Sequence, residues 1–340
     1  MNLITGATGF VGAHLTLHLL ENGQSVRALY RHESKKDFTR KLFSLYGKEH
    51  LYPKIEWHKA DLCDIPALEP AFENVLKVYH CAALVSFDPR DEPAMRKANI
   101  EGTANMVNLS LAFGVEKFLH LSSIAALGDP ISPETIVDET TEWNPEKEHS
   151  DYAISKYGAE MEVWRARQEG LSVLIVAPAV ILGPIPDLEK SGQGSAQIFK
   201  EIKKEFPFYT NASNGFISVT DVVRLMNELM ESGISNERFI AVAEHHNMHW
   251  ISKKVAAAYR VKAPFIEAGP KLLRAALLFD RFLSVFGKKR KLFSDSIPAL
   301  LSKSRFSDAK LQSALKTEYT DISTYIEECV RIMDSKPTTL

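Results

Sequence analysis

The feature that most limits the fold of this chain is a glycine turn at its start. The segment reads Leu3-Ile4-Thr5-Gly6-Ala7-Thr8-Gly9-Phe10-Val11-Gly12, between a β-rich run and an apolar helical pattern. Small residues let the backbone turn sharply and approach a pyrophosphate, which then lies on the N–H groups at the helix start. A glycine triplet alone is weak evidence, but this strand–turn–helix context is the one that the chemistry requires. The turn predicts a dinucleotide site formed by Gly6, Thr8, Gly9, Phe10, Val11 and Gly12.

The first half of the chain alternates β-rich runs with helical patterns. Repeated βα alternation indicates a parallel sheet with helices on both faces and right-handed crossovers, a doubly wound α/β fold of the Rossmann type. The helical patterns cover Val11–Glu21, Met95–Ala112 and Tyr152–Gln168. The expected strands are Asn2–Thr5, Ser25–Tyr30, Lys54–Lys59, Val75–His80, Lys117–Leu121 and Ser172–Ala177.

The pattern changes after Pro178. Residues 179–214 are rich in Pro and Gly and predict loops around one helix, whereas 215–243 return to the βα style and short helices dominate from about His245. We therefore expect a Rossmann-type domain of residues 1–178 and 215–243. A smaller, mostly helical C-terminal substrate lobe would comprise 179–214 and 244–340. It would close over the carboxyl edge of the sheet, where open α/β sheets bind ligands.

Composition excludes several classes of function. The 340 residues carry a formal net charge of -2, so no basic surface predicts a nucleic-acid partner. Cys63, Cys81 and Cys329 are widely spaced, which favours buried thiols in a reducing compartment over disulfides or zinc. With no visible signal peptide, we expect a cytoplasmic protein.

Two C-terminal segments have alternative interpretations. His245-His246-Asn247-Met248-His249 could suggest a metal, but no complete ligand set surrounds it, so exposed loop histidines before a Trp250–Tyr259 helix are expected. Residues 271–291 combine an apolar helix, Lys271–Phe286, with a basic cluster, Lys288–Lys291. Such a helix could rest on an anionic membrane, but we favour a helix that lines the ligand pocket or a dimer contact.

The end of the second expected strand indicates which dinucleotide binds. An NAD site usually carries an acidic residue there, about 20 positions after the turn, to hold the ribose 2′-hydroxyl. This chain has Tyr30 and then Arg31, with Lys35 and Lys36 nearby. A missing carboxylate beside a cation favours NADP over NAD, although Arg31 could also be a solvated strand-end charge.

Tyr152-Ala-Ile-Ser-Lys156 opens the longest helical pattern and supplies the candidate catalytic pair. Residues i and i+4 share a helical face, and a nearby ammonium favours the phenolate, which brings proton exchange closer to neutral pH. Ser122 and Ser123 end the strand Lys117–Leu121. We select Ser123 to hold a substrate carbonyl, with Ser122 as the alternative. No GxSxG elbow surrounds them, so a hydrolase is not expected.

Together these residues resemble the extended short-chain dehydrogenase/reductases, the NAD-dependent epimerase/dehydratase superfamily. The resemblance implies that Thr5–Gly12 binds the pyrophosphate, that Ser123, Tyr152 and Lys156 form the catalytic set, and that Asn99 supports the lysine through water. It further implies that the coenzyme is contacted by Asp61 and Leu62 at the adenine, by Ala82 and Ala83 along its length, and by Pro178, Val180 and Ile181 at the nicotinamide.

Departures from the family pattern narrow the expected activity. Nucleotide-sugar dehydratases carry an Asp-Glu pair after the catalytic serine or threonine, where this chain has Ile124-Ala125. Sugar epimerases usually keep the acidic residue that Tyr30 replaces. The chain is more similar to dihydroflavonol reductases and 3β-hydroxysteroid dehydrogenases, which implies NADPH-linked reduction of a carbonyl, or oxidation of an alcohol, on a small apolar substrate. A sugar epimerase using NAD and a non-catalytic NADP sensor are the alternatives. A homodimer is expected because family members often pair through the helices at 95–112 and 152–168.

Overall fold

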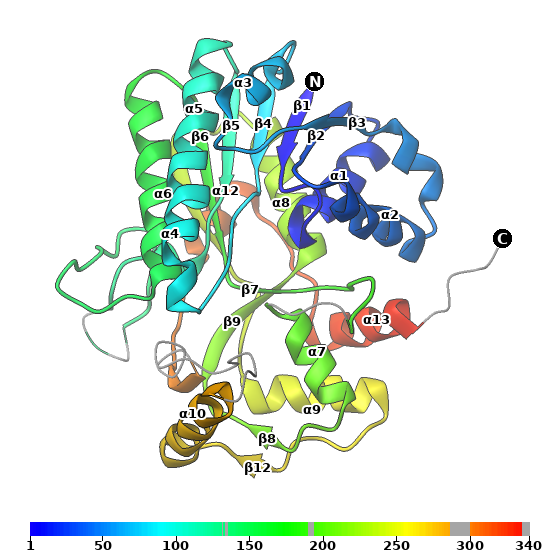
Figure 1. Ribbon diagram of the computed structural model, residues 1–340, viewed down its shortest axis with the longest axis vertical. Coiled ribbons are helices and arrows are strands. Elements are labelled where there is room, and N and C mark those ends of the chain that lie inside the picture. Colours follow the sequence, from blue (N-terminus) through cyan, green and yellow to red (C-terminus); the bar gives the residue numbers. More distant parts are fainter. Residues whose placement is uncertain (131, 133–134, 190–193, 286–299, 335–340) are drawn as a thin grey trace.

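A computed structural model describes residues 1–130, 132, 135–189, 194–285 and 300–334 (Figure 1). Within these residues a seven-stranded parallel sheet has the strand order β10-β6-β5-β4-β1-β2-β3. The order reverses between β1 and β4, which places the ligand crevice of such a sheet at the ends of these two strands. The fold is the predicted doubly wound Rossmann type. Its strands are β1 (Asn2–Thr5), β2 (Val26–Tyr30), β3 (Glu56–Lys59), β4 (Lys77–His80), β5 (Lys117–Leu121), β6 (Val173–Pro178) and β10 (Glu237–Ala241).

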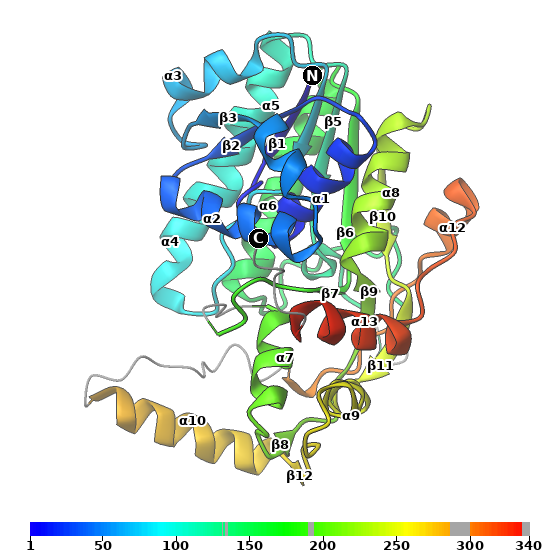
Figure 2. The ribbon, with the colours of Figure 1, turned by 90° about the vertical axis from the view of Figure 1, so that its right-hand side faces the viewer.

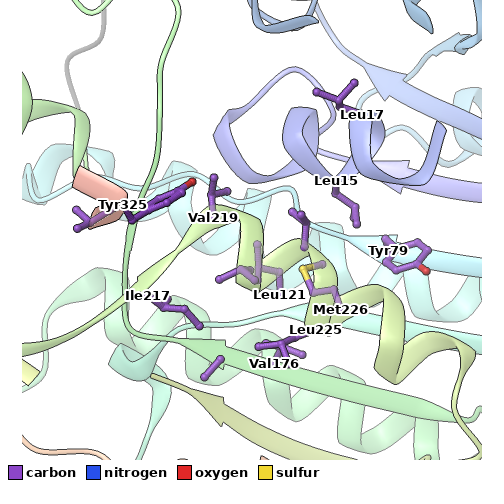
Figure 3. Close-up of a cluster of buried hydrophobic side chains, with 14 of the residues drawn as sticks. Leu15, Leu17, Tyr79, Leu121, Val176, Ile217, Val219, Leu225, Met226 and Tyr325 are labelled. Carbon is purple, nitrogen blue, oxygen red and sulfur yellow. The ribbon is translucent and has the colours of Figure 1, made fainter. Parts of the chain in front are cut away.

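Both faces of the sheet are covered except at the edge strand β3, and successive apolar residues of the central strands enter opposite cores. Ile4 packs under α1 (Phe10–Glu21), α2 (Lys36–Leu45) and α8 (Val219–Glu231), while its neighbour Leu3 packs under α3 (Ile65–Leu68), α5 (Gly102–Ala112) and α6 (Asp151–Gln168). Figure 3 shows the first core, where Leu15, Leu121 and Met226 meet between α1, β5 and α8. Near-continuous apolar strands are the pattern expected of a parallel sheet covered on both sides.

A second set of elements lies at the carboxyl end of the sheet in both views (Figures 1 and 2). Two small sheets form it: β7 (Val180–Leu182), β9 (Ser213–Ser218) and β11 (Glu244–Asn247) make one, and β8 (Phe208–Tyr209) with β12 (Ile266–Glu267) makes the other. The remaining helices are α4 (Glu92–Met95), α7 (Ala196–Lys203), α9 (Met248–Tyr259), α10 (Pro270–Val285), α12 (Ala309–Leu315) and α13 (Ile322–Asp334). The division of the chain into the two expected domains stays a prediction.

Two sequence expectations differ from this part of the structure. β9, expected to continue the βα style, pairs with β7 and β11 and lies outside the central sheet. His245 and His246 lie in β11 and not in a loop, and His249 lies in α9, whereas the expected exposure holds for His245. The strand pairs with β9. In addition, the His245 ring accepts a hydrogen bond from the Phe306 N–H at 3.0 Å, and the His246 ring stacks on Trp250 with centroids 3.6 Å apart.

The helix expected at Lys271–Phe286 is α10, which projects from the rest of the protein in Figure 2. Its last expected residue, Phe286, and the basic cluster Lys288–Lys291 lie outside the described residues. In the described part of the chain, no helix is both long and apolar enough to cross a membrane.

Candidate active site

The glycine turn connects β1 to α1 with a backbone that other residues could not adopt without displacement. Gly6 has a φ of 69°, and a Cβ on it would lie 2.7 Å from the Ala82 nitrogen. The Gly9 N–H donates to the Gly6 carbonyl at 2.8 Å, and a Cβ on Gly12 would lie 2.2 Å from the same oxygen. Gly9 is exposed at the start of α1, with Thr8, Phe10 and Val11 partly exposed around it. The turn thus has the close approach and the open helix terminus that a pyrophosphate requires.

Arg31 and Asp61, which follow β2 and β3, lie side by side at the sheet edge. The Arg31 guanidinium is 3.4 Å from the Asp61 carboxylate, and both side chains are largely exposed. The Lys36 ammonium lies 4.6 Å from the centre of the Tyr30 ring. Arg31 and Lys36 thus lie beside Tyr30 at the end of β2, and each is paired with a carboxylate, Arg31 with Asp61 and Lys36 with Glu33 at 2.6 Å.

Three of the other expected coenzyme contacts lie around the crevice between β1 and β4. The Ala82 N–H donates to the Thr5 hydroxyl at 3.0 Å, which fixes the segment after β4 beside the turn, and Ala83 is exposed. Leu62 follows β3 and packs closely against Gly102. A Cβ added to Gly102 would lie only 3.0 Å from the Cβ of Leu62.

The expected nicotinamide contacts lie at and after the end of β6, the strand between β5 and β10 in the sheet. Pro178 ends β6, while Val180 and Ile181 are half-buried in β7.

The two serines after β5 have different partners. The Ser123 hydroxyl lies close enough to the phenol of Tyr152 to act on its pKa, and it accepts from the Ala125 N–H at 3.1 Å. Ser122 is buried and donates to the carboxylate of Glu160. The geometry therefore favours Ser123 over Ser122 as the residue that would hold a substrate carbonyl.

Tyr152 lies in the first turn of α6, where Ser150 caps the helix by accepting from the Ala153 N–H at 3.2 Å. Burial raises the pKa of the Tyr152 phenol, and the hydrogen bond from Ser123 only partly opposes this effect. Burial and the Ser123 hydroxyl are the influences found on this phenol, so the lowering expected from Lys156 stays a prediction. A raised pKa keeps the phenol protonated at neutral pH, which suits a proton donor.

Lys156 is fully buried one turn further along α6. Its ammonium donates to the Leu121 carbonyl at 2.8 Å and lies 3.2 Å from Nε2 of His120. Burial lowers the pKa of Lys156 to about 8, and the nearby Glu160 carboxylate opposes this lowering. The lysine therefore reaches the carboxyl end of β5, next to Ser122 and Ser123.

Asn99 lies in a π-helical segment, Arg96–Glu101, which precedes α5. Its side-chain oxygen accepts from the Leu84 N–H at 2.7 Å, and its amide donates to the Leu84 carbonyl and to the Ser155 hydroxyl, each at 2.9 Å. The direct contacts of Lys156 are instead with His120 and Leu121. Support of the lysine by Asn99 through water stays a prediction.

Sequence reasoning missed two groups that the structure adds to the site. His120 points from the middle of β5 to Lys156, and its only sequence signal is a histidine inside an apolar run. Glu160 is fully buried and paired with Arg238 of β10 at 3.0 Å. This pair joins residues 78 positions apart and has no local signal in the sequence.

Comparison with known proteins agrees with this geometry. The model of the NAD dependent epimerase/dehydratase family matches residues 2–241. The chain belongs to this family.

Several family members are similar over most of the chain. A putative dihydroflavonol 4-reductase of Synechocystis is 34% identical over 64% of this chain and 60% of its own length. Sterol demethylase protein B of Methylococcus capsulatus is 31% identical over 82% of this chain and 80% of its own. The solved structure of gox2253 is 28% identical, with a TM-score of 0.79 over 98% of this chain and 97% of its own. Both the glycine turn and the Ser123–Tyr152–Lys156 set lie within the family match.

Proposed function

We propose that this protein is an NADPH-dependent oxidoreductase that reduces the carbonyl of a small apolar molecule or oxidises the corresponding alcohol. The observation that carries the proposal is the contact between the Ser123 hydroxyl and the Tyr152 phenol, beside the buried Lys156. Membership of the family and the reductase name of the Synechocystis relative support the same class of reaction. The relative's own substrate is not assigned to this chain.

The residues present fit a bound dinucleotide, because Gly6 and Gly12 leave no room for a Cβ and the start of α1 is open. The coenzyme supplies the hydride when it is bound. Ser123 would hold the substrate oxygen by a hydrogen bond, and Tyr152 would give that oxygen its proton. Lys156 would hold the nicotinamide ribose and favour the phenolate that remains. Fixed donors aimed at a developing oxyanion stabilise it strongly.

Removal of the phenol tests the proposal. Tyr152→Phe should lower turnover by about two to four orders of magnitude, the usual contribution of a positioned proton donor. The Kd for NADPH, measured by fluorescence titration, should change less than twofold, since the phenol binds the substrate more than the coenzyme. Tyr157→Phe is the matched control, because Tyr157 stacks on Trp143 with centroids 4.4 Å apart. Retained turnover in Tyr152→Phe would overturn the assignment.

The preference for NADP belongs to this proposal and rests on Arg31 and Lys36 near Tyr30. Arg31→Ala should raise the Kd for NADPH about tenfold, the loss of roughly one charge-assisted hydrogen bond, and leave the Kd for NADH unchanged. Titration of both coenzymes with both proteins measures this. A wild-type protein that binds NADH more tightly would contradict the preference.

An apolar substrate is proposed from the side chains beside the phenol. The Phe87 ring meets the Tyr152 ring edge-on, with centroids 6.3 Å apart, and Phe87 is 48% exposed. Ile124, which follows Ser123, and Ile181, which lies three positions after Pro178, are half-buried. Activity against a panel of aromatic aldehydes and hydroxysteroids would identify the class. Turnover of a UDP-sugar without added coenzyme would instead indicate an NAD-dependent epimerase, and NADPH binding without any turnover would indicate a sensor.

Location and assembly are also proposals. Cys63, Cys81 and Cys329 are free thiols, which fits the cytoplasm. A homodimer through α5 and α6 is proposed, with the exposed Phe113 and Met161 beside the contact, and light scattering would measure its mass. Membrane association through 271–291 is the less favoured alternative, and pelleting with anionic liposomes at low salt would reveal it.

A further inference from the structure

A buried histidine lies against the catalytic lysine and has no role in the proposed reaction. His120 is 1% exposed, and its Nε2 lies 3.2 Å from the Lys156 ammonium. Its other ring nitrogen, Nδ1, is buried without a hydrogen-bond partner among the described residues. An ammonium can only donate, so Nε2 must be the unprotonated acceptor and Nδ1 must carry the hydrogen. The hydrogen-bond pattern thus assigns one tautomer of a neutral imidazole.

The neighbouring His80 cannot take this role, because both of its ring nitrogens are already occupied. His80 and His120 stack with centroids 5.3 Å apart on adjacent strands. The Thr103 hydroxyl donates to the Asn99 carbonyl at 2.5 Å, so it accepts from Nε2–H of His80 at 2.9 Å. Nδ1 of His80 then accepts from the Thr5 hydroxyl at 2.8 Å. His80 connects the glycine turn to α5, while only His120 faces the lysine.

We propose that His120 is the positioning residue of Lys156. Its neutral imidazole and the Leu121 carbonyl accept two of the three ammonium hydrogens and leave the third to point toward the coenzyme ribose. In this chain the imidazole does directly what the family resemblance assigned to Asn99 through water. The inference rests on the proposed function, because it assumes that Lys156 holds the coenzyme.

The same contact should favour the charged form of Lys156, alongside the Glu160 carboxylate that opposes the effect of burial. Burial lowers the pKa of the lysine to about 8, and a hydrogen bond that accepts from the ammonium favours the charged form. Removal of the acceptor should therefore lower the pKa further. The titratable groups that face Lys156 or act on it are Tyr152 and Glu160 on α6, His120 on β5, His80 on β4 and Cys81 after β4. Burial keeps His80 and His120 neutral and the Cys81 thiol protonated at neutral pH.

The pH dependence of NADPH binding tests the inference without any substrate. In the wild-type protein the affinity should fall as pH rises through the pKa of Lys156, near 8. His120→Leu should move this midpoint down by about one pH unit, the effect of one hydrogen bond to a charged group, and weaken binding about threefold at pH 7.5. His120→Gln should restore most of the midpoint, because the Gln carbonyl oxygen can accept near the position of Nε2.

A core truncation on the same strand separates this effect from general destabilisation. Leu119 is fully buried next to His120, so Leu119→Ala should lower the free energy of unfolding and leave the binding midpoint where it is. An unchanged midpoint in His120→Leu, or an equal shift in Leu119→Ala, would overturn the inference.

A second readout does not depend on coenzyme. Selective ¹⁵N labelling of histidine should show His120 with hydrogen on Nδ1 and a deprotonated Nε2, and Lys156→Met should change the Nε2 shift. A hydrogen on Nε2 would refute the assignment. Failure of the wild-type protein to bind NADPH or NADH would refute the proposed function instead, and the labelling result would still decide the role of His120.

Discussion

The buried pair of Glu160 and Arg238 permits a prediction whose size follows from the structure. Glu160 is fully buried on α6, and Arg238, with 14% of its side chain exposed, supplies its balancing charge at 3.0 Å. Arg238→Met removes that charge and keeps much of the volume. Breaking a buried pair typically costs about 3–5 kcal/mol, because the remaining charge is uncompensated.

Protonation of Glu160 limits this cost. Without Arg238, the Glu160 carboxyl can take up a proton and so avoid a buried charge. At pH 7, protonating a carboxyl whose pKa is 4.5 costs about 3.4 kcal/mol, at about 1.36 kcal/mol per pH unit. At pH 5 the same protonation costs only about 0.7 kcal/mol. These figures are upper limits, because the raised pKa of Glu160 makes protonation in the folded protein easier than the ordinary pKa implies. We therefore expect Arg238→Met to lose less than about 3.4 kcal/mol of charge-related stability at pH 7 and less than about 0.7 kcal/mol at pH 5.

The direction of the pH effect follows from linkage. Burial raises the pKa of Glu160 above its unfolded value, so the folded protein binds more protons between these two pKa values. The stability contribution of Glu160 is fully present below pH 4.5 and is lost as pH rises through the folded pKa. Arg238→Met raises that folded pKa further, so the variant should lose stability with rising pH more steeply than the wild-type protein.

Urea unfolding followed by tryptophan fluorescence at pH 5 and pH 7 measures both quantities. Glu160→Gln in the Arg238→Met background removes the charge and should recover most of the loss at pH 7. Lys204→Met is the matched control, since Lys204 and its partner Glu189 are both largely exposed and should contribute nothing measurable. An equal loss for Arg238→Met at both pH values would show that packing, or the lost contact of Arg238 with the Glu139 carbonyl, causes it.

Two further predictions concern the glycine turn and Ser123. Gly12→Ala places a Cβ 2.2 Å from the Gly6 carbonyl oxygen, so the Kd for NADPH should rise more than about tenfold, whereas Gly233→Ala has open space and should bind normally. Wild-type affinity in Gly12→Ala would contradict the role of the turn. Ser123→Ala should lower kcat about a hundredfold with a smaller change in KM. Ser123→Ala should also raise the pKa of Tyr152, because the Ser123 hydroxyl no longer opposes the effect of burial. The pH–rate profile measures this pKa, and an unchanged profile would contradict the prediction.

The central fold could be predicted because its information is local. Most strands of the main sheet are short, largely apolar runs followed by a turn or a periodic helix, so the βα order follows directly from the sequence. The edge strand β3, Glu56–Lys59, is the polar exception. The end of Lys117–Leu121 was predicted correctly, and it places Ser122 and Ser123 at the edge where ligands bind. The bounds of α6 differ by one residue from the expected Tyr152–Gln168.

The pairing of distant segments could not be predicted in the same way. Residues 215–243 were expected to continue the βα style, but nothing in their sequence shows that the strand at Phe216 joins β7 and β11 in a separate sheet. His245 and His246 pair with Gly215 and Asn214 of β9, and the Phe306 ring lies against His245 from 61 positions further along the chain, so neither contact has a local signal in the sequence.

The buried charges were hidden for a related reason. Glu160 follows Lys156 by four positions on a helix, a spacing that ordinarily indicates a solvated ion pair. Only the fold reveals that both are buried and that the partner of Glu160 is Arg238, from the last strand of the sheet.

The buried pair of Glu160 and Arg238 connects the core to the candidate site. A buried ion pair is weak evidence for stability, since apolar residues of the same size often serve the fold as well. The pair of Glu160 and Arg238 does something that apolar residues could not, because Glu160 accepts the hydroxyl of Ser122. Anchoring Ser122 fixes the backbone where β5 ends, and the next residue, Ser123, is thereby held toward the Tyr152 phenol. The carboxylate thus lies behind the strand end that carries the serine of the proposed catalytic set, and we expect it to position that serine through Ser122.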